Sequence, residues 1–228
     1  MRIISVKHGF ASDHSSTSYE FLAVDKPLGK KERGEVSKLS SRVNPTSRRA
    51  DFIYHVDGYD IPGGWKNLME RYYDVMYSES YDWWTLAIAF SADPGKYEKL
   101  LPYDFSGQDD LGVGITKKGQ RIIVTISCRI ELGMDYPDGD GYYYDEEDEN
   151  EDEDEDEDEE NGTVETDNEF LNLLVKIRQQ IVSGDYGVLY AVWEMYGDED
   201  DENPPPKPRK RKTNEKTINE FKNMLAGV

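Results

Sequence analysis

A run of carboxylates divides the chain and limits what it can fold into. From Asp145 to Glu160 there are fifteen acidic residues, interrupted only by Asn150. Neighbouring carboxylates repel one another, and the run has no apolar side chain to bury. We therefore expect residues 135–164 to form a disordered acidic linker, with folded structure only before and after it.

The same run accounts for most of the charge. The formal net charge is −21, and without these fifteen carboxylates it would be −6, an ordinary value for a folded domain. Such acidity disfavours binding to nucleic acid, which requires Lys and Arg, or to an anionic membrane surface. Only a short basic cluster predicts weak, salt-sensitive contact with nucleic acid. Its members are Lys207, Arg209, Lys210, Arg211 and Lys212.

Cysteine content and hydropathy predict a cytoplasmic protein. Cys128 is the single cysteine, so no disulfide can form within the chain, and nothing suggests secretion. We expect this thiol to be buried and inert. The apolar part of the N-terminus is too short for a signal sequence, and no run approaches the roughly 18 apolar residues of a membrane span.

The sequence pattern of residues 1–134 predicts an α+β domain that folds without the rest of the chain. Apolar residues between Trp65 and Tyr73 recur at helical spacing after two glycines. The continuous apolar run Trp83–Phe90 fits a strand buried on both faces, although periodicity leaves a buried helix open. Gly112–Thr116 and Arg121–Ile126 predict a hairpin. Short strands interspersed with helices favour a mixed sheet with helices packed on it.

Beyond the acidic run we expect a small helical part. We expect a helical hairpin over residues 165–197. Residues 198–228 contain a Pro-rich linker and the basic cluster, and we expect them to end in a helix. Thr-x-x-Glu patterns beginning at Thr166 and Thr217 are typical of capping boxes at helix N-termini.

The first candidate functional segment is the polar loop from His8 to Ser18. Such a loop could cradle a phosphate with its hydroxyl and backbone N–H groups, or three of its side chains could bind a metal together with His55. The spacing matches no standard zinc signature, so we expect no metal or cofactor. A plain polar connection stays an alternative. The candidate residues are His8, Asp13, His14, Ser15, Ser16 and Ser18.

The second candidate segment surrounds Glu79 and Asp82. Two carboxylates in different surroundings can divide the roles of acid and base. The alternative is structural: Asp82 starts the next element, and the following pair Trp83 and Trp84 belongs to the core.

Three stretches resemble an uncharacterised family of bacterial hypothetical proteins. They are HGFASDHSSTSYEF (residues 8–21), IPGGW (61–65) and YDVMYSESYDWW (73–84). The likeness covers roughly residues 1–100 and implies a bacterial cytoplasmic setting. The family has no established activity, so it assigns no role to any residue.

Two classes of function stay open. A compact domain followed by an acidic tether and a helical part favours a non-catalytic interaction or regulatory protein with a protein partner, although the run could be only a solubilising spacer. The alternative is a small enzyme, or a phosphate- or metal-dependent protein, that uses the His8–Ser18 loop with Glu79 and Asp82. Signatures for a phosphate-binding loop, a dinucleotide fold and a nucleophile elbow are absent.

Overall fold

The structure of the 228-residue chain is a computed structural model. The predictions about most of the His8–Ser18 loop and about the acidic run fall outside the residues that the structure describes. The described residues are 17–54, 60–80, 83–130, 164, 166–198, 203–208 and 212–225.

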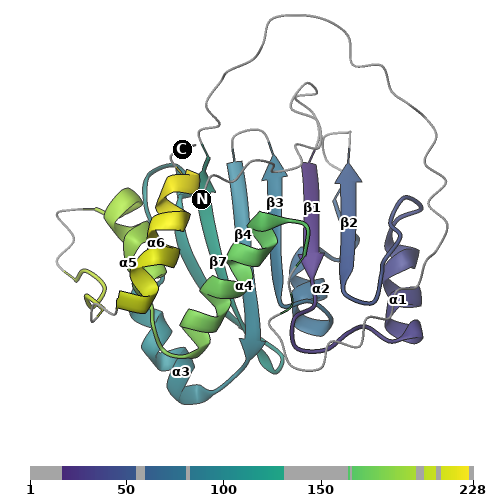
Figure 1. Cartoon of the computed structure of the whole chain (residues 1–228), viewed down its shortest axis with the longest axis horizontal. Coiled ribbons are helices and arrows are strands. Elements are labelled where there is room, and N and C mark those ends of the chain that lie inside the picture. The colour runs from purple at the N-terminus through teal and green to yellow at the C-terminus, as the bar shows by residue number, and fades with distance from the viewer. Residues whose placement is uncertain are drawn as a thin grey trace, which may run out of the picture.

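A seven-stranded sheet forms the centre of the molecule (Figure 1). Its order is β2-β1-β3-β4-β7-β6-β5, and every pair of neighbours is antiparallel. The strands are β1 (Thr17–Leu22), β2 (Arg49–Tyr54), β3 (Val75–Ser80), β4 (Trp83–Ser91), β5 (Phe105–Ser106), β6 (Gly112–Lys118) and β7 (Arg121–Arg129). The α+β class is confirmed. The sheet is antiparallel where a mixed one was expected, because the hydrophobic pattern of a strand does not fix the direction of its neighbours.

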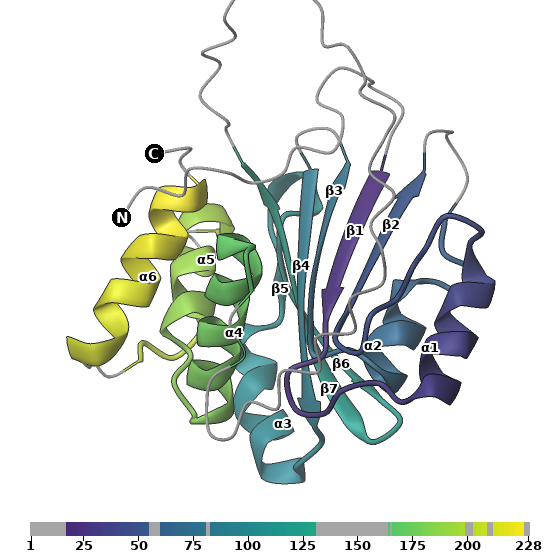
Figure 2. The same cartoon turned by 45° about the vertical axis from the view of Figure 1, so that its right-hand side comes forward.

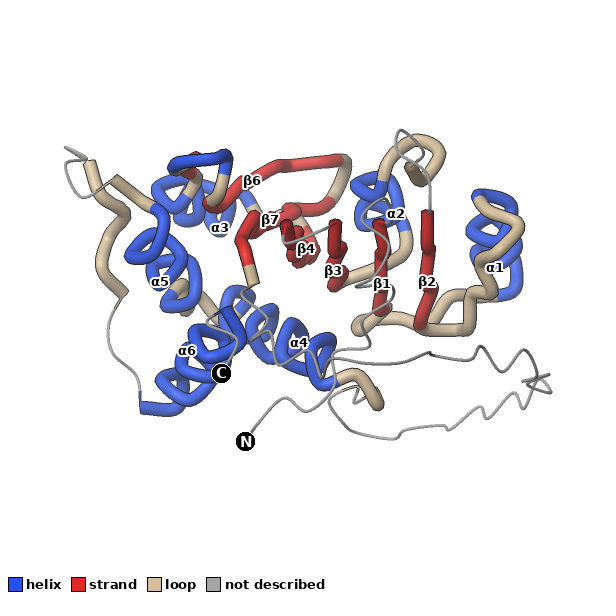
Figure 3. Tube along the Cα trace, turned by 90° about the horizontal axis from the view of Figure 1, so that it is seen from above, coloured by secondary structure: helices blue, strands red, loops and turns tan. Residues whose placement is uncertain are grey.

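Helices cover both faces of the sheet, as the end-on view of Figure 3 shows. One face carries α1 and α2, and the other carries α4, α5 and α6 (Figure 2). The helices are α1 (Lys30–Val36), α2 (Trp65–Arg71), α3 (Pro94–Leu100), α4 (Glu169–Val182), α5 (Gly187–Tyr196) and α6 (Lys212–Leu225). Short 3-10 turns η1, η2 and η3 span Ser37–Leu39, Leu101–Tyr103 and Gln108–Asp110.

Strand β4 is buried on both faces, which explains its lack of alternation. Leu86 and Ile88 belong to the core beneath the C-terminal helices, whereas Ala87 and Ala89 belong to the core beneath α2. Because alanine is small, the backbone of α2 can approach the sheet closely on that side. The prediction of a doubly buried strand for this run is therefore confirmed.

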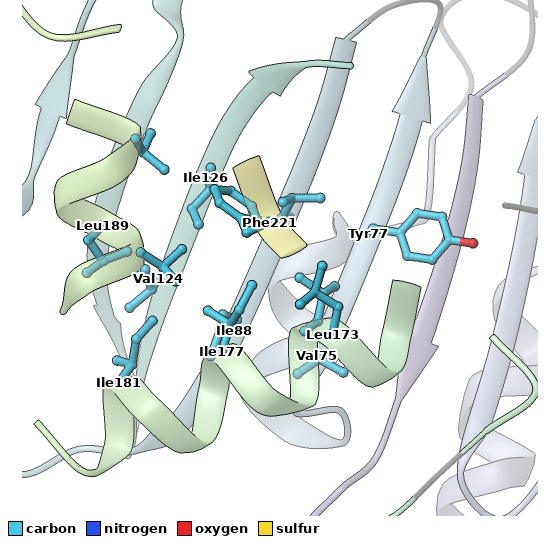
Figure 4. Packing of buried hydrophobic residues seen from close by; sticks show 14 of the residues in the cluster. Val75, Tyr77, Ile88, Val124, Ile126, Leu173, Ile177, Ile181, Leu189 and Phe221 are labelled. Carbon is cyan, nitrogen blue, oxygen red and sulfur yellow. The ribbon is translucent and has the colours of Figure 1, made fainter. Parts of the chain in front are cut away.

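The C-terminal helices share one hydrophobic core with the sheet (Figure 4). Phe221 from α6 and Ile177 from α4 are fully buried in the same cluster as Ile88 and Val124. Helix α6 packs against both α4 and α5. The sequence-based boundary after residue 134 runs through this core, so the acidic stretch connects two elements of one packed unit.

Both expected capping boxes are wrong. The Asn168 side chain caps α4 by accepting hydrogen bonds from the N–H groups of Phe170 (2.9 Å) and Leu171 (3.1 Å). Thr166 lies outside the helix, where its hydroxyl donates to the Asn168 carbonyl. Thr217 lies inside α6, which begins at Lys212. The Thr-x-x-Glu pattern failed because Asn168 is an equally good cap two residues further on, and because α6 starts upstream of its pattern.

Candidate functional site

Five strand ends meet at one edge of the sheet, at the top in Figure 1. The strand register aligns the first residues of β1 and β4 with the last residues of β2, β3 and β7. We call this edge the upper rim and define it by Thr17, Ser18, Glu79, Ser80, Trp83 and Arg129. The described residues of the two segments that the sequence singles out lie at this rim.

The described ends of the two candidate segments are neighbours. Ser18 and Glu79 are direct cross-strand partners, and Thr17 Oγ1 donates to Ser80 Oγ at 3.1 Å. The other candidates in these segments lie outside the described residues. They are His8, Asp13, His14, Ser15, Ser16 and Asp82, together with His55.

Glu79 is a half-buried carboxyl on the face that α4 covers. Its cross-strand neighbours are Ser18 and Trp84, and among the described residues no hydrogen bond or ion pair holds it. Burial raises the pKa of this carboxyl to about 7, because the charged form loses hydration and gains no compensating partner among the described residues. The group can therefore gain or lose a proton near neutral pH.

The two adjacent tryptophans have different surroundings. Trp84 is 1% exposed and stacks on Tyr77 at 5.7 Å, as the structural interpretation of the pair requires. Its indole N–H has no partner among the described residues. Trp83 is 38% exposed, so it is not a core residue. The Arg129 guanidinium lies 4.5 Å from the centre of the Trp83 ring, an arrangement typical of a cation–π contact.

Two residues beyond Ser18 along β1, the Glu20 carboxylate accepts hydrogen bonds that hold α4 on the sheet. It accepts from Tyr77 Oη (2.5 Å), Asn168 Nδ2 (2.8 Å) and Arg49 Nη2 (3.2 Å). Burial, reinforced by Glu20, raises the pKa of Tyr77. No local pattern predicts this network, because Asn168 lies 148 positions from Glu20.

A second polar cluster, also missed from the sequence, lies at the opposite end of β3. Asp74 is 3% exposed and accepts hydrogen bonds from the N–H groups of Val24 (2.7 Å) and Asp25 (2.8 Å). Arg121 donates to the same carboxylate, and Arg178 Nη2 lies 3.6 Å from it. Both carboxylate oxygens of Asp74 accept hydrogen bonds, so this cluster is structural.

The described residues offer no metal site and no activated thiol. Within them, no group of three or more His, Cys, Asp or Glu side chains lies close enough to hold a metal ion. Cys128 is fully buried, and burial raises the pKa of its thiol to about 12, so a thiolate does not form near neutral pH. Among the described helices, none has the length and hydropathy to cross a membrane.

Comparison of the chain with protein-family models, with curated proteins and with solved structures gave no match.

Proposed function

We propose that the protein is a non-catalytic interaction protein that binds a protein partner at the upper rim. The exposed Trp83 with Arg129 stacked on its ring carries this proposal. Tryptophan and arginine are enriched among the few residues that dominate binding energy at protein interfaces. Among the described residues, the large apolar side chains that are exposed are Trp83, Leu101 and Met195, and of these Trp83 alone has an aromatic ring.

The backbone around this pair supports the proposal. Trp83 and Arg129 are direct partners in the ladder between β4 and β7, and Asp109 forms an ion pair with Arg129 at 3.4 Å. Side chains that are already ordered lose less entropy on binding. The chain continues from Ile130 into the stretch that contains the acidic run, so we expect a partner with a basic surface.

The test is quantitative affinity purification with three full-length proteins. They are the wild type, Trp83→Ser, and Leu101→Ser as a matched control, since Leu101 is 37% exposed in η2. We expect the wild type and the control to retain the same partner, and Trp83→Ser to lose it. Equal retention by all three proteins would exclude the rim as the binding surface.

A second candidate function, a small enzyme, is favoured by one observation at the same edge. The Glu79 pKa of about 7 suits a general acid or base, and the hydroxyls of Thr17 and Ser80 lie on neighbouring strands. Glu79→Gln distinguishes the two functions, because it removes the titrating group while keeping the side-chain shape. An enzyme should lose turnover in Glu79→Gln, whereas an interaction that depends on Trp83 should lose partner capture in Trp83→Ser.

We further propose that this interaction takes place in the cytoplasm of a bacterium. The resemblance of residues 8–21 and 73–84 to a bacterial family supports the source, and the lone, buried Cys128 suits a reducing compartment. Detection of the tagged protein in a periplasmic extract would contradict the location.

A further inference from the structure

A proline-rich segment of the chain lies against aromatic side chains, away from the residues that define the upper rim. We call Pro204–Pro208 the proline strap; it contains four prolines and Lys207. Pro205 is buried, and Tyr103 Oη donates a hydrogen bond to the Pro206 carbonyl at 2.7 Å. The strap is therefore bound to the fold.

Tyr103 of η2 and Tyr190 of α5 contact the strap, and each of them packs against a second aromatic ring. Tyr103 packs against Tyr186, with ring centres 5.3 Å apart, and Tyr190 packs against Trp193 at 5.5 Å. Lys207 Nζ lies 5.7 Å from the centre of the Tyr190 ring. We call these four aromatic residues the aromatic shelf.

The chemistry of the strap matches that of the shelf. Proline fixes φ near −65° and cannot donate a backbone hydrogen bond, so consecutive prolines favour an extended helix without internal hydrogen bonds. Its carbonyls must find donors elsewhere, and Tyr103 supplies one. Burial raises the pKa of Tyr103 to about 12, so this hydroxyl stays protonated at neutral pH.

We propose that the aromatic shelf is a polyproline-recognition site whose resident ligand is the proline strap. A hydroxyl that donates to a proline carbonyl and an aromatic ring beneath a cation are two features by which aromatic-lined grooves bind proline-rich peptides, and the strap makes both contacts. The external ligand is a proline-rich protein segment with a nearby Lys or Arg. This inference does not depend on the function proposed for the rim.

A short contact of this kind is suited to exchange. The strap is held in place because it belongs to the same chain, which gives it a high effective concentration. A partner segment with more proline contacts competes with the strap and releases it. Release also separates Lys207, the first residue of the basic cluster, from the Tyr190 ring.

The first experiment replaces residues 204–208 of the full-length protein by Gly-Ser-Gly-Ser-Gly. A fluorescein-labelled peptide with the sequence of residues 203–208 is then titrated against both proteins by fluorescence anisotropy. We expect at least tenfold tighter binding to the variant than to the wild type, whose shelf is occupied. Adding Tyr103→Phe to the variant should weaken binding about fivefold, the effect of one net hydrogen bond. No binding to the folded variant, or equal binding to both proteins, would overturn the proposal.

A second variant serves if that replacement disturbs folding. Lys207→Glu removes only the cation above Tyr190 from an exposed position. We expect the same peptide to bind this variant several-fold more tightly than the wild type, because the strap is held less firmly. Lys26→Glu makes the same charge change at an exposed site elsewhere. Equal binding by the two variants shows that the strap does not occupy the site, and the proposal then fails.

Discussion

Two carboxyl groups at opposite ends of β3 have opposite surroundings. Asp74 directly precedes the strand and is almost completely buried, yet two backbone N–H groups and two arginines surround it. Glu79 lies near the other end, is only half-buried, and has no partner among the described residues. Its pKa is raised to about 7 by burial. Burial without a described donor therefore raises the pKa of Glu79, whereas donors compensate the buried charge of Asp74.

The difference separates a structural site from a candidate functional one. Asp74 joins the segment after β1, the start of β7 and helix α4, three elements that are distant in sequence. A fully paired buried charge of this kind contributes specificity of packing and is very sensitive to loss of a partner. An unpaired, half-buried acid costs stability, and such groups cluster at functional sites.

The largest effect should follow removal of everything after residue 134. The sequence alone predicts that residues 1–134 fold independently. However, this truncation removes Arg178 from the Asp74 cluster and uncovers the core face that contains Ile88 and Val124. We now expect no cooperative thermal unfolding, because the exposed apolar surface is no longer buried by the helices. A sharp melting transition of the fragment would show that residues 1–134 form an independent domain.

Next in size is Asp74→Ala. It removes the counter-charge of Arg121 and Arg178 and the acceptor for two N–H groups. Breaking a buried pair in this way costs about 3–5 kcal/mol of unfolding free energy, measurable by urea denaturation. Glu79→Gln is the matched control on the same strand. We expect it to cause no loss of unfolding free energy at neutral pH. Similar losses of unfolding free energy in both variants would contradict the proposed difference between the two ends of β3.

A smaller effect is expected from pH. Because the folded pKa of Glu79 is raised above its usual value of 4.5, the folded state holds the proton more tightly than the unfolded state. The wild type should therefore lose stability as pH rises from about 4.5 to about 7. Allowing for solvent screening at this half-exposed site, the loss is about 1–2 kcal/mol. The stability gap between wild type and Glu79→Gln, followed by urea denaturation, should open over that range, and a constant gap would contradict it.

The smallest effect concerns the hydrogen bond between Thr17 and Ser80. Thr17→Val keeps the side-chain shape and removes the hydroxyl that donates to Ser80 Oγ. Since this contact is only partly buried, we expect a loss of about 0.5–1 kcal/mol in urea denaturation. A loss as large as that of Asp74→Ala would show that the rim is a structural cluster too.

Local sequence patterns predicted the helices and strands, but they did not predict contacts between residues that are distant in the sequence. The glycines before Trp65 and the unbroken apolar run of β4 marked a helix and a central strand correctly, because each depends on neighbouring residues. The hairpin of β6 and β7 was also predicted correctly, and its two-residue turn is formed by Gly119 and Gln120. Gly119 adopts a φ of 56° there, which glycine tolerates. Neither the Asp74 cluster nor the docking of α4 on the sheet could be found, because their members meet only after the chain has folded.

The candidate site was predicted in part. Ser18 and Glu79 were singled out from separate segments, and the register of β1 and β3 makes them neighbours. The exposure of Trp83 was missed, because a pair of adjacent tryptophans in a strand does not reveal which face is covered.

The most direct test of the contrast between the two ends is a titration of Glu79 by NMR. In protein labelled with carbon-13 at the Glu side-chain carboxyl, the resonance lost in Glu79→Gln identifies this group. We predict that the resonance titrates with a pKa of about 7. A midpoint near the ordinary 4.5 would show that Glu79 is solvated or paired, and the account of the upper rim as an unsatisfied, functional edge would then be wrong.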